Sequence, residues 1–219
     1  MRIALVHATP VAVEPIRETF QRAWPEVETV NLLDDSLPAD RAATAELTER
    51  VSERILRLAV YARDIGSDAV LFTCSAFGPA IEAAARTLPI PVLKPNEAMF
   101  EDAIRQGDRI GMIATFGPAV ATMEAEFRDE ARRLNSSARL RTELVEDAMT
   151  ALRAGDVDTH NRLVAERAAR LGDCQAIVLA HFSTARAAEA VRKAVRQPVL
   201  TSPDAAVARL RRVLGREAA

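Results

Sequence analysis

The chain repeats itself at a constant spacing of 107 residues, and this repeat constrains its fold more than any other feature. Arg2–Val6 matches Arg109–Ile113, and Ala69–Phe72 matches Ala176–Leu179. The same shift pairs Phe20 with Phe127, Pro91–Leu93 with Pro198–Leu200, and Glu97 with Asp204. Because a single shift aligns separated segments without a gap at these landmarks, we interpret the chain as two duplicated halves.

Each half has the same order of expected elements. A short apolar strand, Ile3–Val6 or Ile110–Ile113, runs into a turn and an amphipathic helix. The other expected elements are strands at Val27–Asn31, near Arg139–Leu144, and at Ala69–Thr73, Ala176–Ala180, Val92–Leu93 and Val199–Leu200, and helices at Ala43–Ile65, Val157–Leu171 and Ala205–Leu214. Gly66 and Gly172 are expected to end the two long helices in a left-handed conformation.

Continuous apolar strands that alternate with helices are typical of a parallel sheet covered on both faces. The sequence therefore predicts an α/β fold of two duplicated Rossmann-like lobes with parallel four-stranded sheets, related by a pseudo-twofold, with the active site in the cleft between them. We expect the first lobe at residues 1–97 and the second at 98–204, with a C-terminal helix at 205–219 packing on the first lobe.

Composition excludes several function classes. Lys+Arg 29 against Asp+Glu 31 gives a net charge of −2, which favours neither a nucleic-acid nor an anionic-membrane partner. The apolar run at the N-terminus is short and leads into His7 and Pro10, so it indicates a buried strand, and no stretch approaches a membrane span. With two cysteines a disulfide framework is not expected, and we expect a cytoplasmic protein.

Cys74 is the leading candidate for a catalytic residue. It directly follows an expected strand and precedes a helix with Pro79 at a favourable first-turn position. Exposed backbone N–H groups and the positive end of a helix dipole favour a thiolate there, the basic and nucleophilic form. A buried, inert cysteine is the structural alternative. The second cysteine, Cys174, precedes its strand at the opposite end of the sheet and is expected to be inert.

His181 is the residue that the 107-residue shift pairs with Cys74, and we expect it to be the second catalytic group. An ordinary histidine pKa suits acid–base chemistry at neutral pH. His7, at another strand end, is expected to bind or orient the substrate, and His160 to be solvated on a polar helix. The histidines and Cys74 lack metal-ligand spacing, and the chain lacks a glycine-rich phosphate loop, so no metal or cofactor is expected.

Hydroxyl-bearing and backbone N–H groups at the expected strand ends form a cradle suited to a carboxylate. The expected substrate-binding residues are His7, Thr9, Pro10, Thr73, Ser75, Ala76, Glu97, Thr115, Phe116, Phe182, Ser183 and Thr184. Ordinary helix capping is the alternative for the serines and threonines. Lys94 is a further candidate for a substrate contact.

The motifs LFTCSAFG around Cys74 and IVLAHFSTA around His181, carried on duplicated halves, resemble the aspartate/glutamate/hydantoin racemase superfamily over essentially the whole chain. The resemblance implies a two-lobed enzyme without metal or pyridoxal phosphate, and a homo-oligomer. Racemases of this superfamily typically carry one cysteine in each lobe. Here His181 occupies the second position, and His7 stands where amino-acid racemases often have an acidic residue.

The residues and the resemblance together predict a cofactor-independent racemase or epimerase. It would act at the α-carbon of a small carboxylate or amino-acid-like substrate, with Cys74 transferring a proton on one face and His181 on the other. Three alternatives stay open. These are a single-cysteine decarboxylase or cis–trans isomerase of a small dicarboxylate, a non-catalytic small-acid binding protein, and a hydrolase with Cys74 as nucleophile and His181 as its base.

Overall fold

A computed structural model describes residues 1–44 and 46–215 of the chain as two compact units. The first unit comprises Met1–Pro95 together with the chain from Ala206 onward, and the second comprises Asn96–Ala205. The chain therefore passes between the units twice, after Pro95 and within helix α10 (Ser202–Val213). Residues 216–219 of the expected C-terminal segment, and Ala45, lie outside the described residues.

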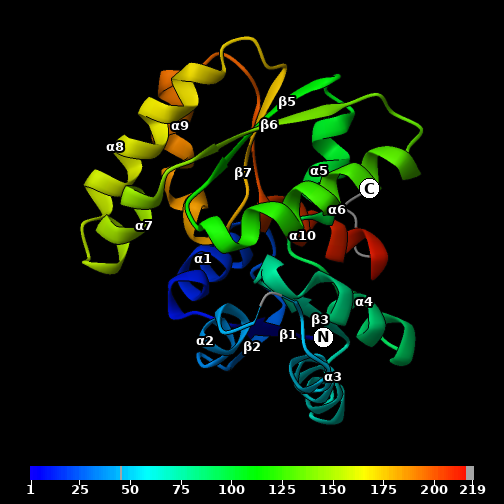
Figure 1. Cartoon of the computed structure of the whole chain (residues 1–219). Helices are drawn as coiled ribbons and strands as arrows, with labels where there is room; N and C mark the ends of the chain where they lie inside the picture. Colours follow the sequence, from blue (N-terminus) through cyan, green and yellow to red (C-terminus); the bar gives the residue numbers. More distant parts are fainter. Residues whose placement is uncertain (45, 216–219) are drawn as a thin grey trace. The chain divides into compact units, whose positions relative to one another are not determined.

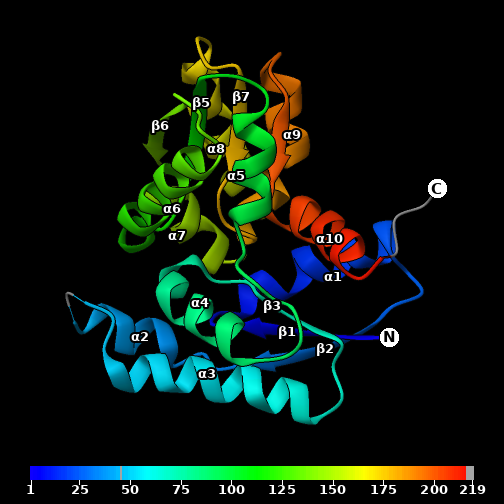
Figure 2. The same cartoon turned by 90° about the vertical axis from the view of Figure 1, so that its right-hand side faces the viewer.

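The first unit contains a parallel four-stranded sheet in the order β2-β1-β3-β4 (Figure 1). Its strands are β1 (Arg2–His7), β2 (Glu28–Leu33), β3 (Ala69–Phe72) and β4 (Val92–Leu93). Its helices are α1 (Val13–Ala23), α2 (Leu37–Ala42), α3 (Glu49–Asp64) and α4 (Gly78–Thr87), with short 3₁₀ turns η1 (Pro10–Ala12) and η2 (Ser75–Phe77). Helix α3 runs along one face of this sheet (Figure 2).

The second unit has a parallel sheet with the corresponding strand order, β6-β5-β7-β8. Its strands are β5 (Arg109–Ala114), β6 (Arg139–Leu144), β7 (Ala176–Leu179) and β8 (Val199–Thr201). Its helices are α5 (Glu97–Ile104), α6 (Val120–Arg133), α7 (Glu146–Arg153), α8 (Val157–Ala168) and α9 (Ala188–Ala194), with 3₁₀ turns η3 (Gly117–Ala119), η4 (Ala169–Leu171) and η5 (Ser183–Ala187). Helices α7, α8 and α9 lie together on one side of this sheet, and α5 and α6 lie on the other (Figure 1).

The strand register supports the duplication. Ile3 pairs with Ala69 in the first sheet, and Ile110 pairs with Ala176 in the second, so both partners shift by the predicted 107 residues. Strand β6 is the exception, since it lies four residues later than this shift would place it. The extra residues explain why its match to β2 is weak in the sequence. The predicted α/β fold with two parallel four-stranded sheets is confirmed.

Alternate residues of the buried strands enter different cores, which explains their continuous apolar sequence. In β7, Val178 packs in the cluster that includes α5 and α6, whereas Ile177 and Leu179 pack in the cluster that includes α8 and α9. Successive side chains of a strand point to opposite faces, so a sheet covered on both sides needs apolar residues at every position.

Two predicted details of the helices are wrong. The helix expected from Ala43 begins at Glu49, because the Thr48 side chain accepts a hydrogen bond from the Val51 N–H at 3.3 Å and caps the helix there. Gly66 has φ +81° as predicted, but Gly172 has φ −61° because α8 continues into the 3₁₀ turn η4.

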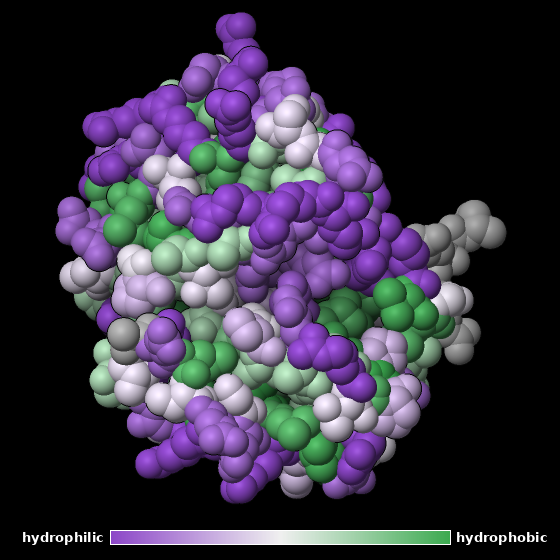
Figure 3. All heavy atoms as spheres, turned by 45° about the vertical axis from the view of Figure 1, so that its right-hand side comes forward, coloured by the Kyte–Doolittle hydropathy of each residue, from purple (hydrophilic) through white to green (hydrophobic). Residues whose placement is uncertain are grey.

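Hydrophilic residues alternate with smaller hydrophobic patches on the face drawn in Figure 3. Within the described part of the chain, each helix is too short or too polar to cross a bilayer.

Candidate active site

In the first unit, Cys74 follows the carboxyl end of β3 and occupies the N-cap position of the turn η2. Its backbone is extended, with φ −123° and ψ 123°, and its side chain is half-buried between the buried residues Thr73 and Ser75. Pro79 stands in the first turn of α4, as predicted, but the 3₁₀ turn η2 separates Cys74 from that helix. The thiol is therefore held at a strand-to-turn junction, one short turn before the α-helix.

His7 connects three neighbouring strands at the same edge of the first sheet. Its Nδ1 lies 2.9 Å from the Thr73 hydroxyl oxygen, and its Nε2 lies 2.9 Å from the Asn31 side-chain oxygen. The ring is fully buried, and burial lowers its pKa while the hydrogen bond to Asn31 opposes that shift. His7 is therefore neutral at pH 7, and both of its nitrogens are engaged by the protein.

The other first-unit candidates lie on the turns that follow β1 and β3. Thr9 occupies the N-cap position of η1 with an extended backbone, and Pro10 is exposed at the first position of that turn. Ser75 and Ala76 are buried in η2. Lys94 forms an ion pair with Glu82 at 2.6 Å, which ties the end of β4 to α4.

In the second unit, two buried hydroxyl groups connect the carboxyl ends of β5 and β7, the strands equivalent to β1 and β3. The hydroxyl oxygens of Thr115, after β5, and Thr184, in η5, lie 3.2 Å apart. One hydroxyl donates to the other, so one of the two protons stays available to a ligand. Ser183 is buried next to Thr184 in η5. Phe116 and Phe182 occupy the positions just before the turns η3 and η5, and Glu97 lies in the first turn of α5.

His181 follows β7 within the turn that leads to η5. Its Nε2 is buried and has no hydrogen-bond partner among residues 1–44 and 46–215. Burial lowers the pKa of His181 to about 4. The expectation of an ordinary histidine pKa is therefore wrong, and the imidazole is neutral at pH 7 with an unsatisfied nitrogen.

His160 is buried, which corrects the expectation that it is solvated. Its side chain is fully buried on α8, where Nδ1 lies 2.9 Å from the Asn161 side-chain oxygen. Burial, and to a smaller extent the charge of Arg186, lowers its pKa. The amphipathic pattern of α8 hid this position, because polar residues surround it in the sequence.

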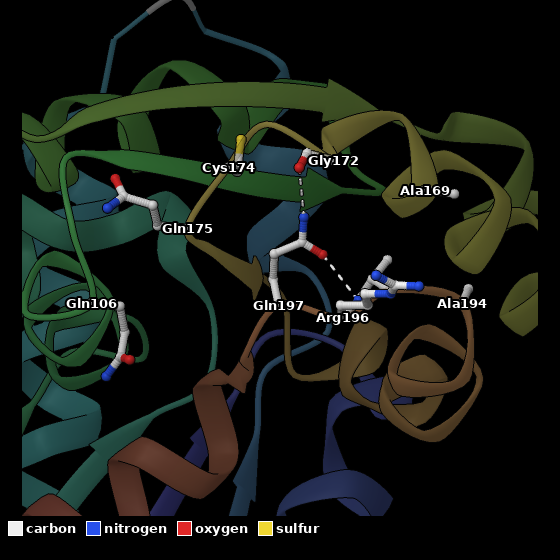
Figure 4. Close-up of a pocket in the computed structure, with 9 residues that line it drawn as sticks. Gln106, Ala169, Gly172, Cys174, Gln175, Ala194, Arg196 and Gln197 are labelled. Carbon is white, nitrogen blue, oxygen red and sulfur yellow. Dashed lines mark hydrogen bonds between the residues drawn. The ribbon is translucent and has the colours of Figure 1, made fainter.

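A pocket of about 570 Å³ opens in the second unit at the amino ends of β5, β7 and β8 (Figure 4). It therefore lies at the opposite end of these strands from Thr115, His181 and the turn η5. Gln197 spans part of its wall, donating to the Gly172 carbonyl at 3.0 Å and accepting from the Arg196 N–H at 3.1 Å. Cys174 lies in this wall, two residues before β7, and burial raises the pKa of its thiol. In the described residues, no group of three or more His, Cys, Asp or Glu side chains is arranged to hold a metal ion.

A family model of Asp/Glu/hydantoin racemases matches residues 6–180, a range that includes Cys74 and the end of β7. The chain belongs to this family. The resemblance inferred from the two strand-end motifs is thereby confirmed. No curated protein matches the chain in sequence.

Solved structures of racemases and a related decarboxylase share the fold. Glutamate racemase from Bacillus anthracis is 14% identical, with a TM-score of 0.74 over 97% of this chain and 81% of that one. Allantoin racemase from Klebsiella pneumoniae is 19% identical, with a TM-score of 0.74 over 98% and 88%. A glycine-to-cysteine variant of arylmalonate decarboxylase in a sulfate-associated form is 16% identical, with a TM-score of 0.71 over 100% and 95%.

Membership of the racemase family supports an isomerase-like enzyme. Within the first unit, the structure brings His7 and Thr73 into contact, and within the second it brings Thr115 and Thr184 into contact. Sequence reasoning missed Asn31, although it is the last residue of an expected strand. It also missed the fully buried pair Asn96 and Ser202, whose side-chain oxygens lie 2.7 Å apart. Asn and Ser at strand ends are too common to single out by type.

Proposed function

We propose that the protein is a cofactor-independent racemase or epimerase that acts at the α-carbon of a small carboxylate, with Cys74 and His181 as the proton-transferring residues. The observation that carries the proposal is the equivalence of their positions. Cys74 follows β3 and His181 follows β7, two strands that occupy the same place in sheets of the same order. Both residues precede a 3₁₀ turn and a helix.

The mechanism starts from the neutral imidazole of His181 and the thiol of Cys74. The imidazole Nε2 removes the α-proton from one face, and the thiol donates its proton to the opposite face of the resulting enediolate. This turnover leaves an imidazolium and a thiolate, which catalyse the reverse reaction. The imidazole of His181 is neutral at pH 7 and its Nε2 has no hydrogen-bond partner in the described residues, so this nitrogen can accept the α-proton in the first of these two directions. A bound carboxylate near this nitrogen would raise its pKa.

The carboxylate and the enediolate need hydrogen-bond donors that are already in place. We propose that the η5 turn supplies them, through Ser183 and through the hydroxyl proton that the Thr115–Thr184 pair leaves available. These groups are buried, so the hydrogen bonds would form where water competes little.

Decarboxylation of a small dicarboxylate is the second candidate, and the low pKa of His181 favours it. With a pKa of about 4, roughly one imidazole in a thousand is protonated at pH 7, so His181 is a poor resting acid. In this reaction carbon dioxide leaves its bonding electrons on the α-carbon, the Cys74 thiol protonates one face, and water restores the thiol. The decarboxylase needs a single acid and yields one enantiomer.

The proposal is tested by solvent exchange. Wild-type protein and the Cys74→Ala variant are incubated in D₂O with small carboxylates, amino acids, hydantoins and substituted malonates, and α-deuterium is measured by NMR. Cys174→Ala serves as the matched control, because it removes the other thiol at the opposite edge of its sheet. We expect exchange in wild type and control, and in Cys74→Ala we expect its loss for the enantiomer whose α-proton faces Cys74. Equal exchange in all three proteins would refute the role of Cys74.

A further inference from the structure

The side chain of His7 is held from both sides by strands that neighbour its own. Strand β1 lies between β2 and β3, and His7 is its last residue. On one side Nε2 meets the Asn31 oxygen of β2 at 2.9 Å, and on the other Nδ1 meets the Thr73 hydroxyl at 2.9 Å. A fully buried ring with both nitrogens at hydrogen-bond distance has a fixed orientation.

The partners of His7 decide where its proton lies. An amide oxygen only accepts, so Nε2 must carry the proton that Asn31 receives. A neutral imidazole carries one N–H, so Nδ1 is left as an acceptor. The Thr73 hydroxyl then donates to Nδ1 at 2.9 Å, in preference to the Val6 carbonyl at 3.4 Å. Its oxygen keeps only lone pairs for any other partner.

We propose that Asn31 is a positioning residue that holds His7 in the Nε2–H tautomer, so that Thr73 presents an acceptor and not a donor at the strand end that carries Cys74. Thr73 immediately precedes Cys74 in the chain, so the polarity of its hydroxyl is set beside the reactive thiol. The tautomer stands independently of any activity, whereas its effect on turnover rests on the proposed function of Cys74.

This arrangement selects the kind of group that Thr73 can bind. An acceptor oxygen favours a thiol S–H or a substrate N–H, and it gives a substrate carboxylate no hydrogen bond. Thr73 therefore does not donate a hydrogen bond to the substrate carboxylate. Hydroxyls such as those of Ser183 and Thr184 in the η5 turn bind the carboxylate instead. His7 itself acts through Thr73, because both of its nitrogens are already engaged.

The tautomer is measured by long-range ¹H–¹⁵N NMR of the full chain labelled with ¹⁵N-histidine. The chain has three histidines, and the His7→Gln variant identifies the signals of His7. We expect a protonated Nε2 and an unprotonated Nδ1 for His7 at neutral pH. A protonated Nδ1 in the wild-type protein would overturn the proposal.

Variants of Asn31 test its control over His7. Asn31 is exposed on an edge strand, so its replacement leaves the core intact. We expect Asn31→Ala to mix the two tautomers and lower the His7 pKa, because a favourable acceptor is lost. We expect Asn31→Asp to raise that pKa, because a carboxylate stabilises the imidazolium. Unchanged tautomer and pKa in both variants would refute the role of Asn31.

Asn161→Ala is the matched control, since Asn161 makes a contact of the same type and length with His160 in the second unit. It should alter the signals of His160 and leave those of His7 unchanged. Once a substrate is known, Asn31→Ala should lower kcat about threefold to tenfold. This is the change in rate expected when the net contribution of one neutral hydrogen bond is lost in the transition state. An altered tautomer with unchanged kcat would refute the link to turnover. If no substrate is turned over by the wild-type protein, the proposed function fails, while the NMR result still decides the tautomer.

Discussion

The low pKa of His181 predicts a loss of folding stability in mild acid. Its pKa is about 4 in the folded chain against 6.5 for an ordinary histidine. The unfolded state therefore binds more protons between these values, so stability is greatest above pH 6.5 and falls as the pH is lowered toward 4. At about 1.4 kcal/mol per pKa unit, the whole effect approaches about 3.5 kcal/mol. Between about pH 7.5 and about pH 5 it amounts to about 2 kcal/mol.

The assay is urea unfolding of wild type and His181→Gln at these two pH values. Glutamine keeps a polar side chain of similar size but does not titrate, so the contributions of the carboxylates cancel when the two proteins are compared. We expect the wild-type protein to lose about 2 kcal/mol more than the variant on acidification. Equal losses in the two proteins would show that His181 titrates normally and would refute the burial argument.

Three further predictions concern the second unit. Gly111→Ala should destabilise the protein by about 1–3 kcal/mol, since the new methyl would lie 2.7 Å from a Leu171 carbon in the core. Urea unfolding measures this change, and a loss of stability below about 0.5 kcal/mol would contradict the packing. In a double-mutant cycle, Thr115→Val and Thr184→Val should show a coupling of about 1 kcal/mol, whereas additive effects would argue against their hydrogen bond. Cys174 should resist a charged thiol reagent in the native state and react in denaturant, because it is buried and the pKa of its thiol is raised. Peptide mass spectrometry measures the labelling, and rapid labelling of the native protein would contradict this prediction.

The sequence predicts the fold well because the fold depends on patterns that are local or repeated. Apolar runs such as Ala69–Phe72 mark strands that are buried on both faces, and the 107-residue repeat carries the order of elements from one half to the other. The helix boundary at Glu49 does not follow from apolar spacing, because a single threonine cap decides it. The helical pattern also does not show that the chain continues into a 3₁₀ turn, which keeps φ of Gly172 at −61°.

The site is predicted less completely, because its chemistry depends on contacts between distant residues. Strand ends such as those at Cys74 and His181 can be located from periodicity. The pairing of His7 with Asn31 depends on strand register, and the burial of His160 and the pKa of His181 depend on tertiary packing. Residue type alone carries none of this information.

The claim that Cys74 and His181 transfer protons on opposite faces of the α-carbon is tested most directly by measuring α-proton exchange for each enantiomer. Each enantiomer of an identified substrate is incubated separately in D₂O with Cys74→Ala and with His181→Gln, and loss of the α-proton is followed by NMR. If the two residues serve opposite faces, each variant should exchange the α-proton of one enantiomer only, and the two variants should retain opposite enantiomers. Loss of exchange for both enantiomers in Cys74→Ala, with both retained in His181→Gln, would contradict the two-residue mechanism.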